Sequence, residues 1–169
     1  MNRYLAGAIG GLLATVPMTL VMESLYRRLP REARYPLPPR EVTENIAGKM
    51  GYDQHLDEDR LIESSLLSHF AYGAATGALY PLVLREPVRH PVVYGSGYGM
   101  AIWAASYLGW VPAFNVLEPA TRQPASRRRL MLCAHVVWGA GTLLIAERIT
   151  HSDDTPWRGE TPPGGWQRP

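Results

Sequence analysis

Hydrophobic positions gather into four long stretches that contain no Asp, Glu, Lys or Arg. These stretches cover residues 4–22, 64–84, 92–117 and 130–146. Each approaches or exceeds the roughly 18–20 apolar positions that a membrane-crossing helix needs. Extended to neighbouring helix-compatible residues, the pattern predicts helices over about 4–26, 57–84, 92–118 and 127–148. The sequence therefore predicts an all-α protein, a four-helix transmembrane bundle.

The polar segments between and after these helices have patterns of their own. Val42, Ile46 and Met50 recur four apart, which predicts a short amphipathic helix over 41–50, lying on the membrane surface or simply within a loop. The last stretch, 151–169, is rich in Pro and Gly and is expected to be an extended polar tail. The expected organisation is one transmembrane domain over 1–150, followed by this tail.

Composition narrows the possible classes of protein. A chain of 169 residues fits one domain, and a net charge of +2 excludes a strongly electrostatic nucleic-acid binder. The mean hydropathy of −0.14 reads as soluble only because charged loops dilute the apolar stretches. One cysteine, Cys133, excludes a disulfide framework or a cysteine-based metal cage. Arg27 and Arg28 follow the first stretch where a cleavage site would need small residues, so we expect a retained helix.

The distribution of basic residues predicts the orientation in the membrane. With four crossings, the 27–60 segment and the 119–129 loop lie on the same side. They hold eleven of the 17 Lys and Arg residues. The positive-inside rule then places both long loops in the cytoplasm and both termini outside.

An internal repeat relates the second predicted helix to the fourth. An offset of 66 aligns His69 with His135, and four of the seven positions after each histidine also match. These matched pairs are Tyr72 with Trp138, Gly73 with Gly139, Ala74 with Ala140 and Thr76 with Thr142. The first and third helices match at an offset of 95. There, Leu13, Val16, Pro17, Val21 and Glu23 align with Leu108, Val111, Pro112, Val116 and Glu118.

Two tandem helix pairs follow from this repeat. A pair contains an even number of crossings, so both halves would enter the membrane in the same direction. The prediction is a pseudo-twofold axis along the membrane normal. Small residues at four-residue spacing, such as Gly7 with Gly11 and Gly95 with Gly99, would let the helices approach closely, within one monomer or at a homo-oligomer seam.

The repeat singles out four ionisable residues at similar predicted depths: Glu23, His69, Glu118 and His135. An ionisable side chain in hydrocarbon costs about 2.5 kcal/mol or more, so such groups usually face the bundle interior or pair with one another. We therefore expect one Glu–His cluster in the cytoplasmic part of the bundle. The matched residues Tyr72, Trp138, Thr76 and Thr142 are expected to surround it.

Four interpretations of this cluster are open. Glu–His hydrogen bonds could simply hold the bundle together. His nitrogen and Glu oxygen atoms suit a metal ion such as Zn, Fe or Mn. Haem could take His69 and His135 as axial ligands, with Gly73 and Gly139 leaving room for the macrocycle. A proton relay could use the same groups.

The motifs together resemble a known family. The first helix with Pro17 and Glu23, the His69-x-x-Tyr-Gly element, the Trp110-Val-Pro112 element and the His135-x-x-Trp-Gly element are similar to the YagU-related bacterial inner-membrane proteins, a family of unknown function. The resemblance covers about residues 4–148. It implies a small multi-pass protein of the bacterial cytoplasmic membrane with a link to acid stress, and it supplies no catalytic mechanism.

No sequence motif indicates a particular enzymatic reaction. The sequence has no nucleophile elbow, phosphate-binding glycine loop, His-Glu-x-x-His element or dinucleotide fingerprint. A small bundle with a polar tail also fits an accessory subunit of a larger membrane complex, with the lipid bilayer as its other partner.

Overall fold

All regular secondary structure is helical in the part of the chain that the computed structural model describes, residues 1–52, 55, 57–85 and 87–151. The long helices are α1 (Arg3–Tyr26), α2 (Pro38–Lys49), α3 (Glu58–Ala78), α5 (Pro91–Ala104) and α7 (Ala125–His151). Shorter elements are η1 (Arg31–Ala33), α4 (Tyr80–Val83), η3 (Ala105–Trp110) and α6 (Val111–Ala113). The all-α prediction is confirmed for these residues, and the expected tail lies almost wholly outside them, at 152–169.

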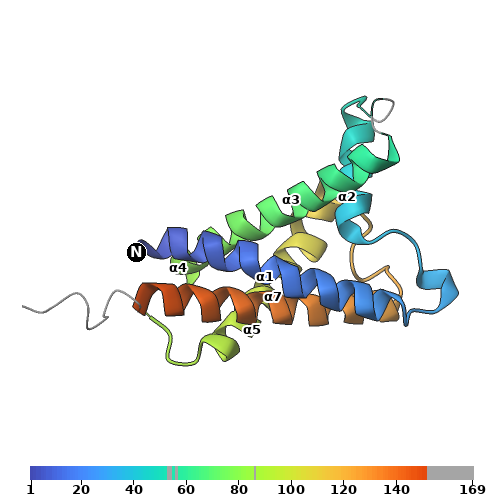
Figure 1. Cartoon of the computed structure of the whole chain (residues 1–169). Helices are drawn as coiled ribbons and strands as arrows, with labels where there is room; N and C mark the ends of the chain where they lie inside the picture. Colours follow the sequence, from blue (N-terminus) through green and yellow to red (C-terminus); the bar gives the residue numbers. More distant parts are fainter. Residues whose placement is uncertain (53–54, 56, 86, 152–169) are drawn as a thin grey trace, which may run out of the picture.

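The two longest helices form the centre of the fold. α1 packs along α7 and α3, and α7 also packs along α5, which gives the spatial order α3–α1–α7–α5. α1 begins at the end of the molecule where α7 finishes, so the two helices are antiparallel (Figure 1). The segment from 27 to 52 and the turn before α7 lie together at the opposite end (Figure 1).

Glycine allows both outer helices to approach the central pair closely. A Cβ atom on Gly11 would collide with the backbone of Gly73, where α1 crosses α3. A Cβ atom on Gly139 would collide with the backbone of Gly95, where α7 crosses α5. Such backbone contact is typical of small-residue helix interfaces. The two helix pairs expected from the repeat are therefore both present, each held through glycine.

The predicted helix over 92–118 is wrong in its second half. Pro112 has no N–H for the carbonyl of Leu108, and Gly109 takes the non-helical angles φ −109° and ψ −108°. The chain widens there into the π-helical stretch η3, and α6 ends at Ala113. The predicted helix over 57–84 is likewise interrupted near Leu79, because Pro81 cannot donate to the carbonyl of Gly77.

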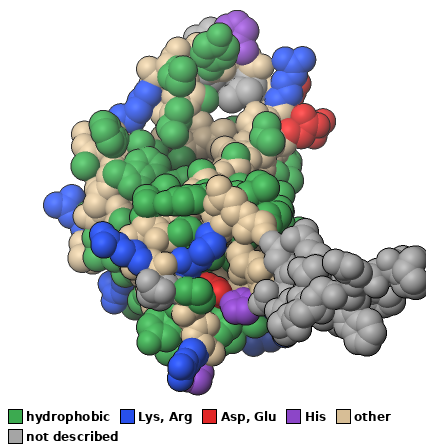
Figure 2. Space-filling view, turned by 90° about the vertical axis from the view of Figure 1, so that its left-hand side faces the viewer, with side chains coloured by type: hydrophobic (Ala, Val, Ile, Leu, Met, Phe, Trp, Pro, Cys, Tyr) green, Lys and Arg blue, Asp and Glu red, His purple; other side chains and the backbone are tan. Residues whose placement is uncertain are grey.

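Charged residues close the end of the molecule where α1 begins. Nη2 of Arg3 lies 3.6 Å from Oε1 of Glu147 and 3.0 Å from the carbonyl oxygen of Leu84, and the guanidinium stands 5.3 Å from the Tyr80 ring centre. These contacts link α1, the end of α4 and α7. Figure 2 views this end, where Lys and Arg side chains stand among a largely apolar surface.

Candidate functional site

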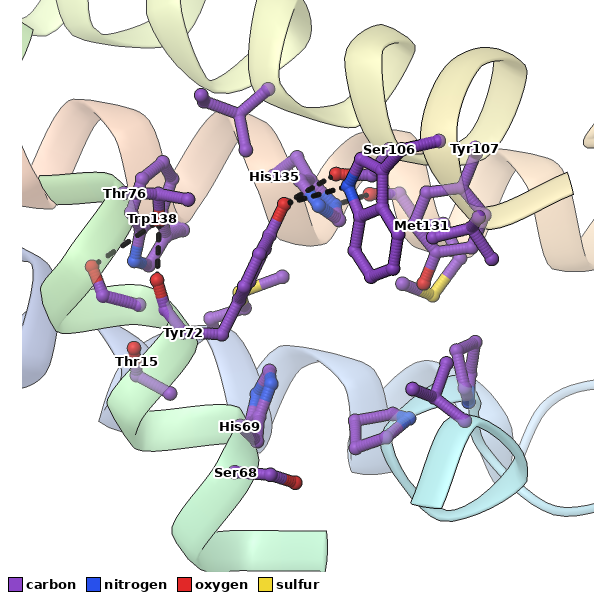
Figure 3. A pocket seen from close by; sticks show the side chains of 18 of the residues that line it. Thr15, Ser68, His69, Tyr72, Thr76, Ser106, Tyr107, Met131, His135 and Trp138 are labelled. Carbon is purple, nitrogen blue, oxygen red and sulfur yellow. Dashed lines mark hydrogen bonds between the residues drawn. The ribbon is translucent and has the colours of Figure 1, made fainter. Parts of the chain in front are cut away.

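A cavity of about 250 Å³, called here the histidine cavity, lies beside α1 between α3, α7 and the irregular stretch from η3 to α6. α1 contributes Thr15 and Met18 to its wall, and α2 covers it with Pro38, Pro39, Val42 and Ile46. His69, Tyr72, Thr76, Ser106, Tyr107, Trp110, Met131, His135 and Trp138 also line it (Figure 3). Its volume is just below the roughly 300–1,000 Å³ of clefts that hold drug-sized ligands. The cavity therefore suits a smaller molecule.

The two repeat-related histidines face this cavity from different helices (Figure 3). His69 stands on α3, and its Nε2 atom is buried with no hydrogen-bond partner. His135 stands on α7 and is 5% exposed. Its Nδ1 lies 2.8 Å from the carbonyl oxygen of Met131, which can only accept, so Nδ1 carries the proton and the Nε2 of a neutral ring is an acceptor.

A hydrogen-bonded group connects α3 to the irregular stretch. The Tyr72 hydroxyl lies 2.8 Å from the Ser106 hydroxyl and accepts a 3.3 Å hydrogen bond from Nε1 of Trp110 (Figure 3). The Tyr72 and Trp110 rings also contact, with centres 6.0 Å apart. Ser106 and Trp110 both belong to η3. The π-helical turn thus directs these side chains at α3, as π-bulges often do at functional sites.

The residues expected around the histidines hold the neighbouring backbone. The Thr76 hydroxyl donates to the carbonyl of Tyr72 at 2.6 Å, and the Thr142 hydroxyl donates to that of Trp138 at 2.7 Å. Nε1 of Trp138 donates across to the carbonyl of Gly11 at 3.1 Å. Tyr72, Thr76 and Trp138 line the cavity, whereas Thr142 lies one turn beyond Trp138.

The expected Glu–His cluster is not assembled. The Glu23 side chain is 56% exposed and pairs with Arg27 at 2.9 Å. Glu118 is exposed on the turn after α6, and its backbone carbonyl accepts from Gln123. Neither carboxylate lines the cavity. Both glutamates stand near chain segments that leave the bundle, where water or a neighbouring arginine stabilises them, so they need no histidine partner.

The metal interpretation fails with the cluster. Among the described residues, no group of three or more His, Cys, Asp and Glu side chains is arranged to hold a metal ion. Both histidines that haem would need as axial ligands do line the cavity. However, haem is larger than a typical drug-sized ligand, and the cavity is smaller than the clefts that hold such ligands.

A buried arginine near the start of α7 was not singled out by the sequence pattern. Arg127 is 2% exposed and donates to the carbonyls of Tyr35 and Pro36 and to Oε2 of Glu41, each at 2.7 Å. Its guanidinium also stands 3.5 Å from the centre of the Tyr35 ring. These contacts fix the start of α2, and hence the cover of the cavity. The sequence did not predict this buried contact, because Arg127 belongs to a run of three arginines, 127–129. Such a run is typical of an orientation signal that faces lipid head groups.

Electrostatics at this cover follow from burial. Burial raises the pKa of the Glu41 carboxyl, and the Arg127 guanidinium opposes that rise. Burial also raises the pKa of the Tyr35 hydroxyl. α2 is further tied to the turn after α6, because Asn45 donates to the carbonyl of Val116 at 2.9 Å and Lys49 to that of Phe114 at 3.2 Å.

Comparison of the chain with protein-family models, with curated proteins and with solved structures finds no match. Two helices, α1 and α7, are long and apolar enough to cross a membrane.

Proposed function

We propose that this chain is a multi-pass membrane protein that binds a small neutral molecule in the histidine cavity. The membrane part rests first on α1 and α7. It also rests on an inverted distribution of side-chain size. The residues of α1 buried against its neighbours are mostly small, whereas Leu20 on α1 is 59% exposed and Leu67 on α3 is 74% exposed. Extensive exposed apolar surface is unfavourable in water and favourable in lipid.

The finer topology belongs to the same proposal. Four crossings would be made by α1, α3 with α4, the 91–113 stretch and α7, with pseudo-twofold symmetry about the membrane normal. The described parts of both long connections lie at one end of the molecule (Figure 1), and the excess of basic residues in these connections favours the cytoplasm for that end. The bacterial inner membrane and membership of the YagU-related family rest on the sequence resemblance.

One observation carries the binding function. Nε2 of His69 is buried beside the histidine cavity and has no hydrogen-bond partner. An unpaired buried polar atom costs about 1–3 kcal/mol, and a ligand with a polar group would remove that cost. The Tyr72 hydroxyl is already hydrogen-bonded, so the imidazole is the group left open at this wall.

Binding is tested with purified full-length protein in detergent micelles. Toluene, phenol and hydroquinone serve as probes, followed by ligand-observed NMR. We expect at least one probe to bind the wild type and to lose binding in Ile102→Trp, which fills the cavity from α5. Ile62→Trp on the exposed face of α3 is the matched control. No specific binding of any probe, or equal binding by both variants, would refute the proposal.

A proton relay is the second candidate, because two titratable imidazoles face the same cavity. It predicts proton flux across vesicles containing the wild type and loss of that flux in His69→Phe or His135→Phe. Absence of flux together with specific probe binding would favour the binding function alone. A role as accessory subunit of a larger complex would appear as a high-mass assembly in native gels of the source membrane.

A further inference from the structure

We propose that the natural ligand of the histidine cavity belongs to the quinol class: a neutral ring with hydroxyl groups at two opposite positions, one bound by His135 and one by His69. The inference rests on the proposed binding function and adds the chemistry of the ligand. Three properties of the cavity carry it: the absence of charge in its lining, two open imidazole nitrogens on different helices, and walls that suit a ring.

Charge is the first property. The lining, as the structure describes it, contains no Asp, Glu, Lys or Arg side chain. A charged ligand would enter without a counter-ion and would leave its hydration behind, which is strongly unfavourable. The cavity therefore selects a neutral molecule. A carboxylate such as benzoate is disfavoured even where its ring would fit.

The His135 imidazole determines what one end of the ligand must offer. Because Nδ1 donates to the Met131 carbonyl, Nε2 of the neutral ring accepts. A ligand hydroxyl can donate a hydrogen bond to Nε2. A ligand carbonyl cannot, because its oxygen and Nε2 are both acceptors and their lone pairs repel each other. The Tyr107 ring stands edge-on to His135, with ring centres 5.8 Å apart and planes at 89°. This contact restricts the orientation of the imidazole.

The His69 imidazole makes a second requirement at another wall. Its unpaired Nε2 belongs to α3, whereas His135 belongs to α7, and α1 packs along both helices. Figure 3 shows the two rings entering the cavity from opposite sides. A ligand with a single polar group would leave one imidazole without a hydrogen bond. A ring with hydroxyl groups on opposite sides can hydrogen-bond to both imidazoles.

The other walls of the cavity are aromatic or apolar and therefore suit a ring. Aromatic side chains of Tyr72, Trp110 and Trp138 and apolar side chains of Met18 and Ile102 surround the space. Aromatic groups favour offset or edge-to-face contact with another ring. A volume of about 250 Å³ accommodates a substituted single ring.

The experiment compares the three probes in wild-type protein and in single histidine variants, under argon so that hydroquinone stays reduced. In His135→Phe and in His69→Phe we expect hydroquinone affinity to fall about tenfold, because each loses one buried hydrogen bond. Toluene affinity should change little in either. The ratio of hydroquinone to toluene affinity within one protein cancels the partition of each probe into micelles.

Two controls keep the result interpretable. His90→Phe alters an exposed histidine at the N-cap of α5 and should leave every probe unchanged. If a phenylalanine variant fails to fold, His135→Gln and His69→Gln keep a polar side chain and are measured in its place. Circular dichroism and gel filtration establish folding in each case.

The outcomes separate this inference from the proposed function. Binding of toluene and hydroquinone that responds identically to both histidine variants would overturn the quinol assignment while leaving a binding cavity. Phenol bound as tightly as hydroquinone would overturn the two-point contact. Failure of every probe to bind would refute the binding function itself. We expect both histidine variants to bind hydroquinone more weakly than the wild type does and to bind toluene as well as the wild type does.

Discussion

Pro17 and Pro112 occupy matching positions in the repeat, yet their helices behave differently. α1 continues through Pro17 for its full 24 residues. The chain around Pro112 leaves the α-helix at Ala105, widens into η3 and ends α6 three residues after it begins. A proline removes one hydrogen bond in either place. The proline alone therefore does not decide whether the helix breaks.

Neighbouring contacts explain the difference. α1 is supported along its length by both α3 and α7. The backbone of the η3–α6 stretch lies mainly against its own neighbours along the chain and meets α3 and α7 through side chains. Gly109 also offers a flexible residue just before Pro112. The break is also what builds the site. Ser106, Tyr107 and Trp110 line the cavity from η3, a contribution that a straight helix would direct elsewhere.

The largest expected effect comes from Arg127, which joins the second half of the repeat to the loop of the first. Arg127→Met removes three hydrogen bonds of 2.7 Å and leaves Glu41, itself largely buried, without its cation. We expect the free energy of unfolding to fall by about 3 kcal/mol. Denaturant titration in detergent measures it, with exposed Arg129→Met as the control. Equal losses in both variants would contradict the assigned role.

The pH dependence of the Arg127→Met deficit gives a second readout. Burial already raises the pKa of Glu41, and loss of Arg127 removes the influence that opposes the rise. A raised carboxyl pKa means that the fold tolerates the protonated form better, so stability is retained at acid pH and lost as pH rises through the folded-state pKa. The deficit should therefore shrink below about pH 4.5. A deficit that grows on acidification would contradict this sign.

Glycine substitutions test whether the two helix pairs are equivalent. A Cβ atom on Gly77 would meet the backbone of Gly7 and Gly11, and one on Gly139 that of Gly95 and Gly99. Gly77→Ala and Gly139→Ala should each lower the free energy of unfolding by about 2 kcal/mol through overpacking. Gly97→Ala on α5, where the Cβ atom meets open space, is the control and should be neutral or slightly stabilising. Tolerance of alanine at only one crossing would break the equivalence.

Proline substitutions address the opening comparison directly. Pro17→Ala restores a helical hydrogen bond within a supported helix and should raise the free energy of unfolding by about 1 kcal/mol. Pro112→Ala frees a residue in an irregular stretch and should lower it by about 0.5 kcal/mol, because the unfolded chain gains freedom. Thermal unfolding of both variants shows whether the free energy of unfolding rises or falls relative to the wild type. A shift of the same sign in both would mean that the two prolines are equivalent after all.

The smallest effect is expected at Arg40, on the solvent side of α2. Arg40 bonds both carboxylate oxygens of Glu58 and lowers the pKa of that carboxyl. Stability from this pair is present above the ordinary pKa of Glu58 and is lost as pH falls through the lowered value. Arg40→Gln should cost far less than Arg127→Met, and its cost should vanish at acid pH and in high salt. A cost that persists in acid would point to packing by the Arg40 stem instead.

Local pattern was sufficient for much of the fold. Uncharged stretches located α1, α3, α5 and α7, and a four-residue spacing located α2, because helix periodicity is a property of neighbours along the chain. The repeat also identified residues that do line one cavity, namely His69, Tyr72, Thr76, His135 and Trp138. Repeated polar positions in apolar helices were an informative signal, because a polar group in an apolar helix usually packs against neighbouring helices.

Depth along a helix did not determine which way a side chain points. Glu23 lies near the end of α1, as predicted, but beside the stripe of Gly11, Met18 and Met22 that faces the bundle, so its side chain turns to the surface. That stripe is visible in the sequence and gives the correct face. The break before Pro112 has a local signal in Gly109 and Pro112 themselves. The folding of α2 over the cavity and the buried position of Arg127 have none. They depend on contacts between residues as far apart as Tyr35 and Arg127, which only the tertiary structure brings together.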